Sequence, residues 1–213
     1  KGEVLYWEVC ARALKESESA RTPNEEFEEV KRVLAAKYLC NFSLFRSAPD
    51  SWAIGQLFPI VPIHRLDETN LDFATLVDVT CDSDGKIDKF VDLKDVKETL
   101  ELPEWRENEE YYVGLFLVGA YQEVMGSFHN LFGLPNEAQV FLVDDGQFHV
   151  SKLIPGSHIE DMVRFAQYES SSLQQAFAKK VNQQVALGNL KQQECDQMVQ
   201  EYIDAARWST YLE

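Results

Sequence analysis

The chain has 213 residues and a net charge of −16, from 36 acidic and 20 basic side chains. This charge argues against binding to nucleic acid or to an anionic membrane surface, because both need a basic protein face. Hydrophobic residues make up 45% of the sequence and aromatic residues 12%, which indicates a globular protein. The length suffices for one large domain or two small ones, and no apolar run approaches the roughly 18 residues of a membrane span.

The four cysteines are widely spaced and form no Cys-x-x-Cys pair, and the four histidines also lack the spacing of zinc ligands. We therefore expect neither a disulfide framework nor a structural zinc site. A reducing compartment is expected instead, namely the cytoplasm, or an organelle in a plant-like source. No signal peptide opens the sequence. The first residue is Lys1 and not Met, so we expect a fragment or a processed product of a longer protein.

Residues 1–37 are predicted to form a pair of helices. Apolar residues recur at helical spacing in 4–14. Thr22-Pro23-Asn24-Glu25 is a typical helix start, with the threonine as N-cap and the glutamate closing a capping box. Helical spacing then continues from Phe27 to Tyr38. This pattern indicates packing and suggests no chemistry.

Residues 38–156 are predicted to form a β-domain. Asn41–Phe45 alternates between polar and apolar residues, two prolines keep Gln56–Ile63 extended, and Leu71–Cys81 is a third strand-like run. Tyr111–Tyr121 is apolar on both faces, which predicts a central strand of a sheet.

Several strands separated by proline and glycine, without βαβ spacing, predict an α+β protein whose β-domain is an antiparallel sandwich or barrel. Asp145-Gly146 lies between two of these strands and is typical of a two-residue type I′ hairpin turn.

Residues 157–213 are predicted to form a C-terminal helical bundle. Ser157-His158-Ile159-Glu160 resembles a capping box at a helix start, and Leu187-Gly188-Asn189 resembles a helix end. An apolar stripe at helical spacing indicates a core or a subunit interface. The stripe consists of Cys195, Met198, Val199, Tyr202, Ile203 and Ala206.

The chemistry of the chain is concentrated in the loop Thr80-Cys81-Asp82-Ser83-Asp84-Gly85. The Cys81 thiol can give or take a proton, and the carboxylates of Asp82 and Asp84 can bind a cation. An ordinary polar turn is the alternative reading of these residues. A calcium loop is excluded, because its first and twelfth positions would be Thr80 and Val91, where carboxylates are needed.

Several stretches, in the same order, carry a resemblance to a known enzyme family. They are Asn41–Phe45, Trp52–Leu66, Thr80–Ile87, Gly119–Gly126 with His129–Gly133, and the closing Tyr202 and Tyr211-Leu212. Through these motifs the chain resembles the carboxyl-terminal third of the biosynthetic arginine decarboxylases. These are pyridoxal-phosphate enzymes of the alanine-racemase-like, group IV type.

The resemblance implies the conversion of L-arginine to agmatine and carbon dioxide in polyamine and spermidine biosynthesis, with dependence on magnesium. In the family, the Schiff-base lysine, the carboxylate on the pyridine nitrogen and most phosphate ligands lie on an N-terminal (β/α)8 barrel. No part of this sequence resembles that barrel, so we expect the chain alone to be inactive. The resemblance implies that the barrel part or a second chain completes the site, in a dimer or a dimer of dimers.

The resemblance also implies roles for individual residues. Cys81 would protonate the substrate carbon, since a thiol with an ordinary pKa of about 8.5 holds its proton at neutral pH. Asp82 and Asp84 are candidates for the guanidinium, which a carboxylate binds through two parallel hydrogen bonds, and which of them binds it stays open. Tyr121 would lie against the cofactor or its phosphate. The alternatives are a packing role for Cys81 and a solvated strand-end hydroxyl for Tyr121.

Two other functions stay open at this point. One is a non-catalytic regulatory or interaction module derived from the family, and the other is a decarboxylase for another basic amino acid. The intact loop argues against the first, because a module without chemistry has no need to keep a thiol and two carboxylates together. The matching stretch Trp52–Leu66 also includes His64 and Arg65, for which the sequence suggests no mechanistic role.

Overall fold

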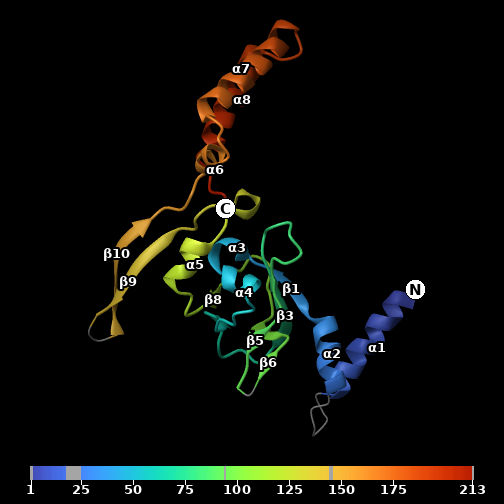
Figure 1. Ribbon diagram of the computed structural model, residues 1–213. Helices are drawn as coiled ribbons and strands as arrows, with labels where there is room; N and C mark the ends of the chain where they lie inside the picture. The colour runs from blue at the N-terminus through green and yellow to red at the C-terminus, as the bar shows by residue number, and fades with distance from the viewer. Residues whose placement is uncertain (1, 18–24, 94, 144–145, 213) are drawn as a thin grey trace. The chain divides into compact units, whose positions relative to one another are not determined.

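The computed structural model describes residues 2–17, 25–93, 95–143 and 146–212, and it confirms the α+β class. Contacts divide the chain into two compact units, residues 1–127 and residues 128–213 (Figure 1). The partition predicted from the sequence, with segments ending at 37 and 156, is a different one and stays a prediction. None of the helices in the described ranges has the length and apolar character needed to cross a membrane.

Unit 1 begins with two helices that pack on one another, α1 (Gly2–Ser17) and α2 (Glu25–Leu34). The predicted helix start at residues 22–24 lies outside the described residues. The expected continuation of α2 to Tyr38 is wrong, because Tyr38 lies in strand β1 (Ala36–Leu39). Its hydroxyl donates a hydrogen bond of 3.0 Å to Asp72 of a neighbouring strand. This tertiary contact outweighs the local helical spacing.

The main sheet of unit 1 is built around β3 (Leu71–Val77). This confirms a strand that begins at Leu71, but the predicted run extended to Cys81 and the strand ends at Val77. β1 pairs with β3 in parallel, with Ala36 opposite Ala74. β7 (Leu100–Pro103) and β4 (Lys86–Ile87) pair with β3 in antiparallel fashion. The parallel pair departs from the antiparallel expectation, since the long crossover between β1 and β3 returns the chain in the same direction. A closed sandwich or barrel stays a prediction.

Two short helices occupy the crossover, α3 (Leu44–Ser47) and α4 (Pro49–Ala53). The prediction of an extended Asn41–Phe45 is therefore wrong at its end. The physical reason lies elsewhere in the chain: the N–H of Leu44, the first residue of α3, donates to the carboxylate of Asp78. Proline at the first position of α4 also favours a helix start, because its missing N–H would have no partner there.

The remaining strands of unit 1 form two small sheets. β2 (Ile60–Pro62) pairs with β8 (Val113–Leu115), which agrees with the extended conformation predicted for Gln56–Ile63. β5 (Phe90–Val91) pairs with β6 (Val96–Lys97).

The predicted central strand Tyr111–Tyr121 is wrong. Only residues 113–115 are in a strand, Leu117 has a φ of 59° and an 85% exposed side chain, and Tyr121 lies in helix α5 (Ala120–Met125). The apolar pattern on both faces therefore did not predict burial on both faces, since Leu117 and Tyr121 are exposed.

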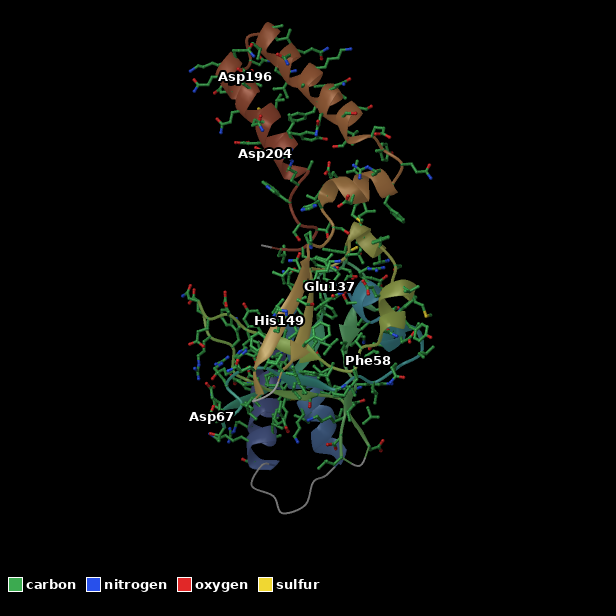
Figure 2. All side chains as sticks on the ribbon, turned by 90° about the vertical axis from the view of Figure 1, so that its left-hand side faces the viewer. Phe58, Asp67, Glu137, His149, Asp196 and Asp204 are labelled. Atoms are coloured by element: carbon green, nitrogen blue, oxygen red, sulfur yellow. The ribbon has the colours of Figure 1, made fainter. Side chains whose placement is uncertain are left out.

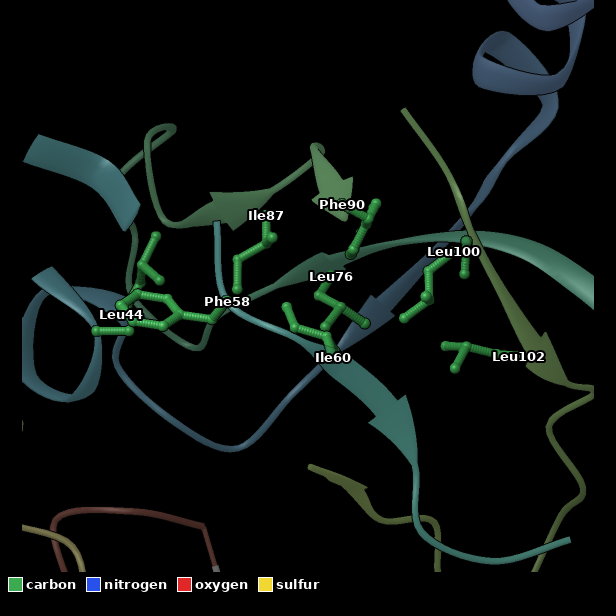
Figure 3. Close-up of a cluster of buried hydrophobic side chains, with 10 residues drawn as sticks. Leu44, Phe58, Ile60, Leu76, Ile87, Phe90, Leu100 and Leu102 are labelled. Atoms are coloured by element: carbon green, nitrogen blue, oxygen red, sulfur yellow. The ribbon is translucent and has the colours of Figure 1, made fainter. Parts of the chain in front are cut away.

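The hydrophobic core of unit 1 lies between the main sheet, β2 and α3 (Figure 3). Its members are apolar side chains that are less than one tenth exposed. They are Leu44, Ala48, Phe58, Ile60, Ala74, Leu76, Ile87, Phe90, Leu100 and Leu102. Burial of this cluster stabilises the sheet from which the Thr80–Gly85 loop extends.

Unit 2 contains the 3-10 turn η1 (His129–Leu131), the strands β9 (Glu137–Leu142) and β10 (Phe148–Ile154), and helix α6 (Ile159–Phe165). Two further helices follow, α7 (Ser170–Ala186) and α8 (Gln192–Ala205). β9 and β10 pair in antiparallel fashion, which confirms the predicted hairpin. Gly146 has a φ of +73°, but Asp145 lies outside the described residues, so the turn type stays a prediction.

The helix ends of unit 2 test two predictions. The capping box predicted at Ser157 is wrong, because the N–H of His158 donates to Asp161, which places the helix start one residue later. The end of α7 at residues 187–189 is confirmed. The N–H groups of Gly188 and Asn189 donate to the carbonyls of Val185 and Gln184, and Gly188 has the positive φ of a Schellman motif.

α7 and α8 pack on one another. The rings of Phe177 and Tyr202 stack with centroids 4.4 Å apart, and Cys195 is buried. This confirms a packing role for Cys195 and Tyr202, which are two members of the predicted stripe. Acidic side chains such as Asp196 and Asp204 point outward from α8 (Figure 2), where solvent accommodates the charge.

The core gives a stability prediction. Leu76 is 1% exposed, and Leu76→Ala should lower the free energy of unfolding by about 2–5 kcal/mol, because it leaves a cavity among packed side chains. Urea unfolding of the 213-residue chain measures the change. Leu93 is fully exposed, so the control Leu93→Ala should change stability by less than about 0.5 kcal/mol. Equal losses in both variants would contradict the assignment of the core.

Candidate functional site

The first half of the Thr80–Gly85 loop is organised by Asp78, whose side chain is 1% exposed. One carboxylate oxygen accepts hydrogen bonds from the N–H of Thr80 at 2.9 Å and from its hydroxyl at 2.7 Å. The other oxygen accepts the N–H of Leu44 at 2.8 Å. The sequence prediction assigned no role to Asp78. The sequence feature that could have indicated its role is the position of this carboxylate directly after an apolar strand.

The second half of the loop is a tight turn. The N–H of Gly85 donates to the carbonyl of Asp82 at 3.1 Å, and the N–H of Asp84 donates to the Asp82 side chain at 2.9 Å. The N–H of Asp78 donates to the carbonyl of Gly85 at 2.8 Å, which ties the end of the turn to the start of the loop. A Cβ at Gly85 would collide with the Asp78 carboxylate and the Thr80 hydroxyl, so this position requires glycine.

The loop presents three of the predicted site residues together. Cys81 and Asp84 are exposed, and Asp82 is half-buried. The indole N–H of Trp52, on α4, donates to Asp84 at 3.4 Å. An exposed thiol beside two carboxylates, on a backbone fixed by hydrogen bonds, can exchange a proton and bind a cationic group.

The fourth predicted site residue, Tyr121, lies on α5 and is 79% exposed. Helix α5 is bound by Arg46, a residue of α3 that is 6% exposed. The Arg46 guanidinium donates to the carbonyls of Gly126 at 2.6 Å and Glu123 at 2.7 Å. The buried Gln122 exchanges two hydrogen bonds with Asp50 of α4. These residues were missed at the sequence level, although Gln122 lies within a recognised motif.

His64 and Arg65 belong to a packing network. The Arg65 guanidinium lies 5.2 Å from the ring centroid of Tyr111, and the His64 ring contacts the same tyrosine at 4.8 Å. Arg65 also pairs with Glu68 and Glu109. These contacts pack His64 and Arg65 against Tyr111, beside the β2–β8 pair.

Unit 1 also has an open cavity of 1040 Å³, lined mainly by β1 and the segment from Tyr111 to Val118. None of the four predicted site residues lines it. Burial raises the pKa of the Cys40 thiol to about 11, and burial with the Asp72 hydrogen bond raises the pKa of Tyr38 to about 12. Both groups therefore stay protonated at neutral pH, and the cavity holds no activated nucleophile among them.

In the part of the chain that the structure describes, three or more His, Cys, Asp or Glu side chains nowhere gather closely enough to hold a metal ion. The magnesium dependence that the resemblance implies stays a prediction.

Comparison with known proteins relates the chain to enzymes. No protein-family model matches it. It is 43% identical over 213 residues to a biosynthetic arginine decarboxylase of Deinococcus radiodurans, covering 100% of this chain and 32% of that protein. It is 41% identical over 212 residues to one of Thermosynechococcus vestitus, covering 100% and 33%.

A solved structure gives the same result. The crystal structure of the biosynthetic arginine decarboxylase SpeA from Campylobacter jejuni matches with a TM-score of 0.71 and 32% identity, over 88% of this chain and 31% of that one. The chain is thus homologous to a class of decarboxylases. It is related along its whole length to the biosynthetic arginine decarboxylases and spans about a third of the length of these relatives, which confirms the resemblance.

The environments of the cysteines give a reactivity prediction. Cys81 is exposed, whereas the pKa of Cys40 is raised to about 11, so at pH 8 very little of Cys40 is thiolate. Iodoacetamide should modify Cys81 at least about tenfold faster than Cys40, measured by peptide mass spectrometry. In urea, as a control, both rates should converge. Equal rates in the folded chain would contradict the observed burial.

Proposed function

We propose that this chain is the carboxyl-terminal portion of a pyridoxal-phosphate-dependent arginine decarboxylase, which converts L-arginine to agmatine and carbon dioxide for polyamine synthesis. The observation that carries the proposal is the exposed Cys81, which is followed by Asp82 and Asp84 on a loop whose backbone is bound by Asp78. Homology over the whole chain to biosynthetic arginine decarboxylases supports it.

The residues of this chain fit one part of a pyridoxal-phosphate site. The exposed phenol of Tyr121 offers a hydrogen-bond donor suited to a phosphate or to the cofactor ring. Pyridoxal phosphate, when bound, supplies an electron sink for the electron pair that is released as carbon dioxide leaves. We assign the lysine, the pyridine carboxylate and most phosphate ligands to the part of the enzyme outside this chain. The isolated chain is accordingly proposed to be inactive.

Cys81 then acts as the general acid. Its sulfur holds a proton at the solvent-exposed tip of the loop and delivers it to the substrate carbon that has lost the carboxylate. The backbone hydrogen bonds of the loop limit the positions that this sulfur occupies, so the proton is delivered to one carbon and not to its neighbours.

Asp82 and Asp84 give the loop its preference for a cationic substrate. A guanidinium is planar and presents paired N–H donors, which a carboxylate accepts through two parallel hydrogen bonds. We infer that one of these carboxylates binds the far end of arginine, in an oligomer in which the rest of the enzyme completes the pocket.

Replacing the acid tests the proposal in the full-length enzyme. Cys81→Ala should lower kcat by about 10²–10⁴-fold, because a positioned general acid is lost, while arginine still binds. Aldehyde formed by misplaced protonation should rise relative to agmatine. Steady-state kinetics with product analysis measure both quantities, and Cys10→Ala serves as the matched control. Normal turnover of Cys81→Ala without aldehyde would mean that Cys81 only packs.

The carboxylates give a specificity prediction. Asp82→Asn and Asp84→Asn remove a charge but keep the side-chain shape, and Asn at 82 keeps the oxygen that accepts the N–H of Asp84. The variant at the binding position should lose about 1.5–3 kcal/mol in kcat/KM for arginine, because a charged hydrogen-bonding partner is lost. The loss for lysine and ornithine should be smaller. If both variants keep the full preference for arginine, the guanidinium is bound elsewhere.

A further inference from the structure

Among the described residues of unit 1, two charged side chains are almost fully buried, whereas Cys81 and Tyr121 are exposed. Asp78 is 1% exposed and Arg46 is 6% exposed. Burying a charge is costly unless its hydrogen bonds are satisfied, so the groups that each one contacts indicate its role. Both side chains involve one short segment, Leu44–Ala53, which comprises α3 and α4 and is named the α3–α4 segment. Asp78 accepts a hydrogen bond from this segment, and Arg46 belongs to it.

On one side, the α3–α4 segment is joined to the Cys81 loop. Asp78 connects the first N–H of α3, from Leu44, to the N–H and hydroxyl of Thr80, the residue before Cys81. The carbonyl of Phe42, just before the segment, accepts the N–H of Val79 at 3.1 Å. Trp52, within the segment, donates to Asp84 at the far end of the loop. The loop is therefore tied to the segment at both of its ends.

On the other side, the same segment holds the helix that carries Tyr121. The two bonds from Arg46 bind the C-terminal carbonyls of α5, and Gln122 and Asp50 exchange a pair of hydrogen bonds. The N–H of Ser127, after the helix, donates to the carbonyl of Phe45 at 2.9 Å. A Cβ at Gly126 would collide with the carbonyl of Arg46, so the two backbones are as close as glycine allows.

We propose that Asp78 and Arg46 are positioning residues, which fix Cys81 and Tyr121 relative to one another through the α3–α4 segment. The inference rests on the proposed function, because it assigns a purpose to the spacing of those two residues. Leu44 and Arg46 stand two positions apart in the same helical turn. A shift of the loop is thus transmitted to α5, and a shift of α5 to the loop.

The physical argument is one of precision. Reacting groups must be held within about 0.5 Å of their productive positions by supporting hydrogen bonds. Neither Cys81 nor Tyr121 is buried, so packing of their own side chains does not supply this precision. The buried bonds of Asp78 and Arg46 do supply it, because their partners are backbone atoms of the loop and of α5.

The first test uses Asp78→Asn in the full-length enzyme. Both oxygens of the Asp78 carboxylate accept hydrogen bonds, whereas the Asn side chain has only one acceptor oxygen. Its NH2 group would face a donor, so at least one of these hydrogen bonds is lost. With protonation as the limiting step, kcat should fall about 10- to 100-fold while KM changes less than about threefold, as expected for a misplaced catalytic group. Asp72→Asn is the matched control. Asp72 lies in β3, the strand that ends directly before Asp78, but its carboxylate accepts only from the Tyr38 hydroxyl among the bonds described.

A double-mutant cycle separates positioning from general damage. In the Cys81→Ala background, Asp78→Asn should cost less than about twofold, because no thiol remains to be positioned. An equal fall in both backgrounds would overturn the role assigned to Asp78. If Asp78→Asn fails to fold, Thr80→Val takes its place in the cycle, because it removes one bond to Asp78 and leaves the carboxylate.

The second test concerns Arg46 and measures the affinity for the cofactor. Arg46→Met should weaken the affinity for added pyridoxal phosphate about 10-fold or more, measured by fluorescence titration, and Arg46→Lys should restore part of it. In a Tyr121→Phe background the effect of Arg46→Met should shrink to less than about twofold. Arg65→Met is the control, because Arg65 belongs to the separate Tyr111 network. Equal losses in both backgrounds would overturn the role of Arg46.

Hydrogen exchange distinguishes failure of this inference from failure of the proposed function. Asp78→Asn should speed amide exchange in residues 79–85 and Arg46→Met in residues 120–126, without substrate or turnover. If Cys81→Ala has normal turnover, the proposed function fails, and the exchange rates still decide whether the two side chains fix these elements. Unchanged exchange in both segments would overturn the positioning role whatever the kinetics show.

Discussion

The structure of unit 1 depends on the hydrogen bonds of one buried carboxylate, that of Asp78. It accepts the N–H of Leu44 with one oxygen and the N–H and hydroxyl of Thr80 with the other. The first contact starts helix α3, and the second fixes the backbone that leads into Cys81. A carboxylate directly after a central strand therefore connects the core, a helix and the Thr80–Gly85 loop.

This arrangement explains how exposed groups are held firmly. Cys81 and Tyr121 both face solvent in this chain, but the backbone beneath each of them is bound to the α3–α4 segment. In the function we propose, Cys81 and Tyr121 act at a surface that the rest of the enzyme completes, and their exposure suits that role. The chain spans about a third of the length of its relatives.

The interpretation from sequence succeeded where local pattern and local structure agree. The strand β3, the β9–β10 hairpin and the end of α7 follow from alternation, a turn dipeptide and a glycine C-cap. It failed where contacts distant in sequence decide the outcome. Tyr38 leaves the helical pattern to pair with Asp72, and residues after Leu115 leave the strand to form α5. The spacing of apolar residues predicts which side of a segment is apolar, but it does not predict which other segment packs against that side.

The sequence by itself determined the family and the composition of the reactive loop, because a thiol, two carboxylates and a closing glycine are adjacent along the chain. Only the tertiary structure decided the support of that loop. Asp78 and Leu44 are 34 positions apart, and Arg46 and Gly126 are 80 positions apart, so no local pattern connects them. Their pairing follows from folding, since buried charges must find hydrogen-bonding partners wherever the packed chain brings donors and acceptors together.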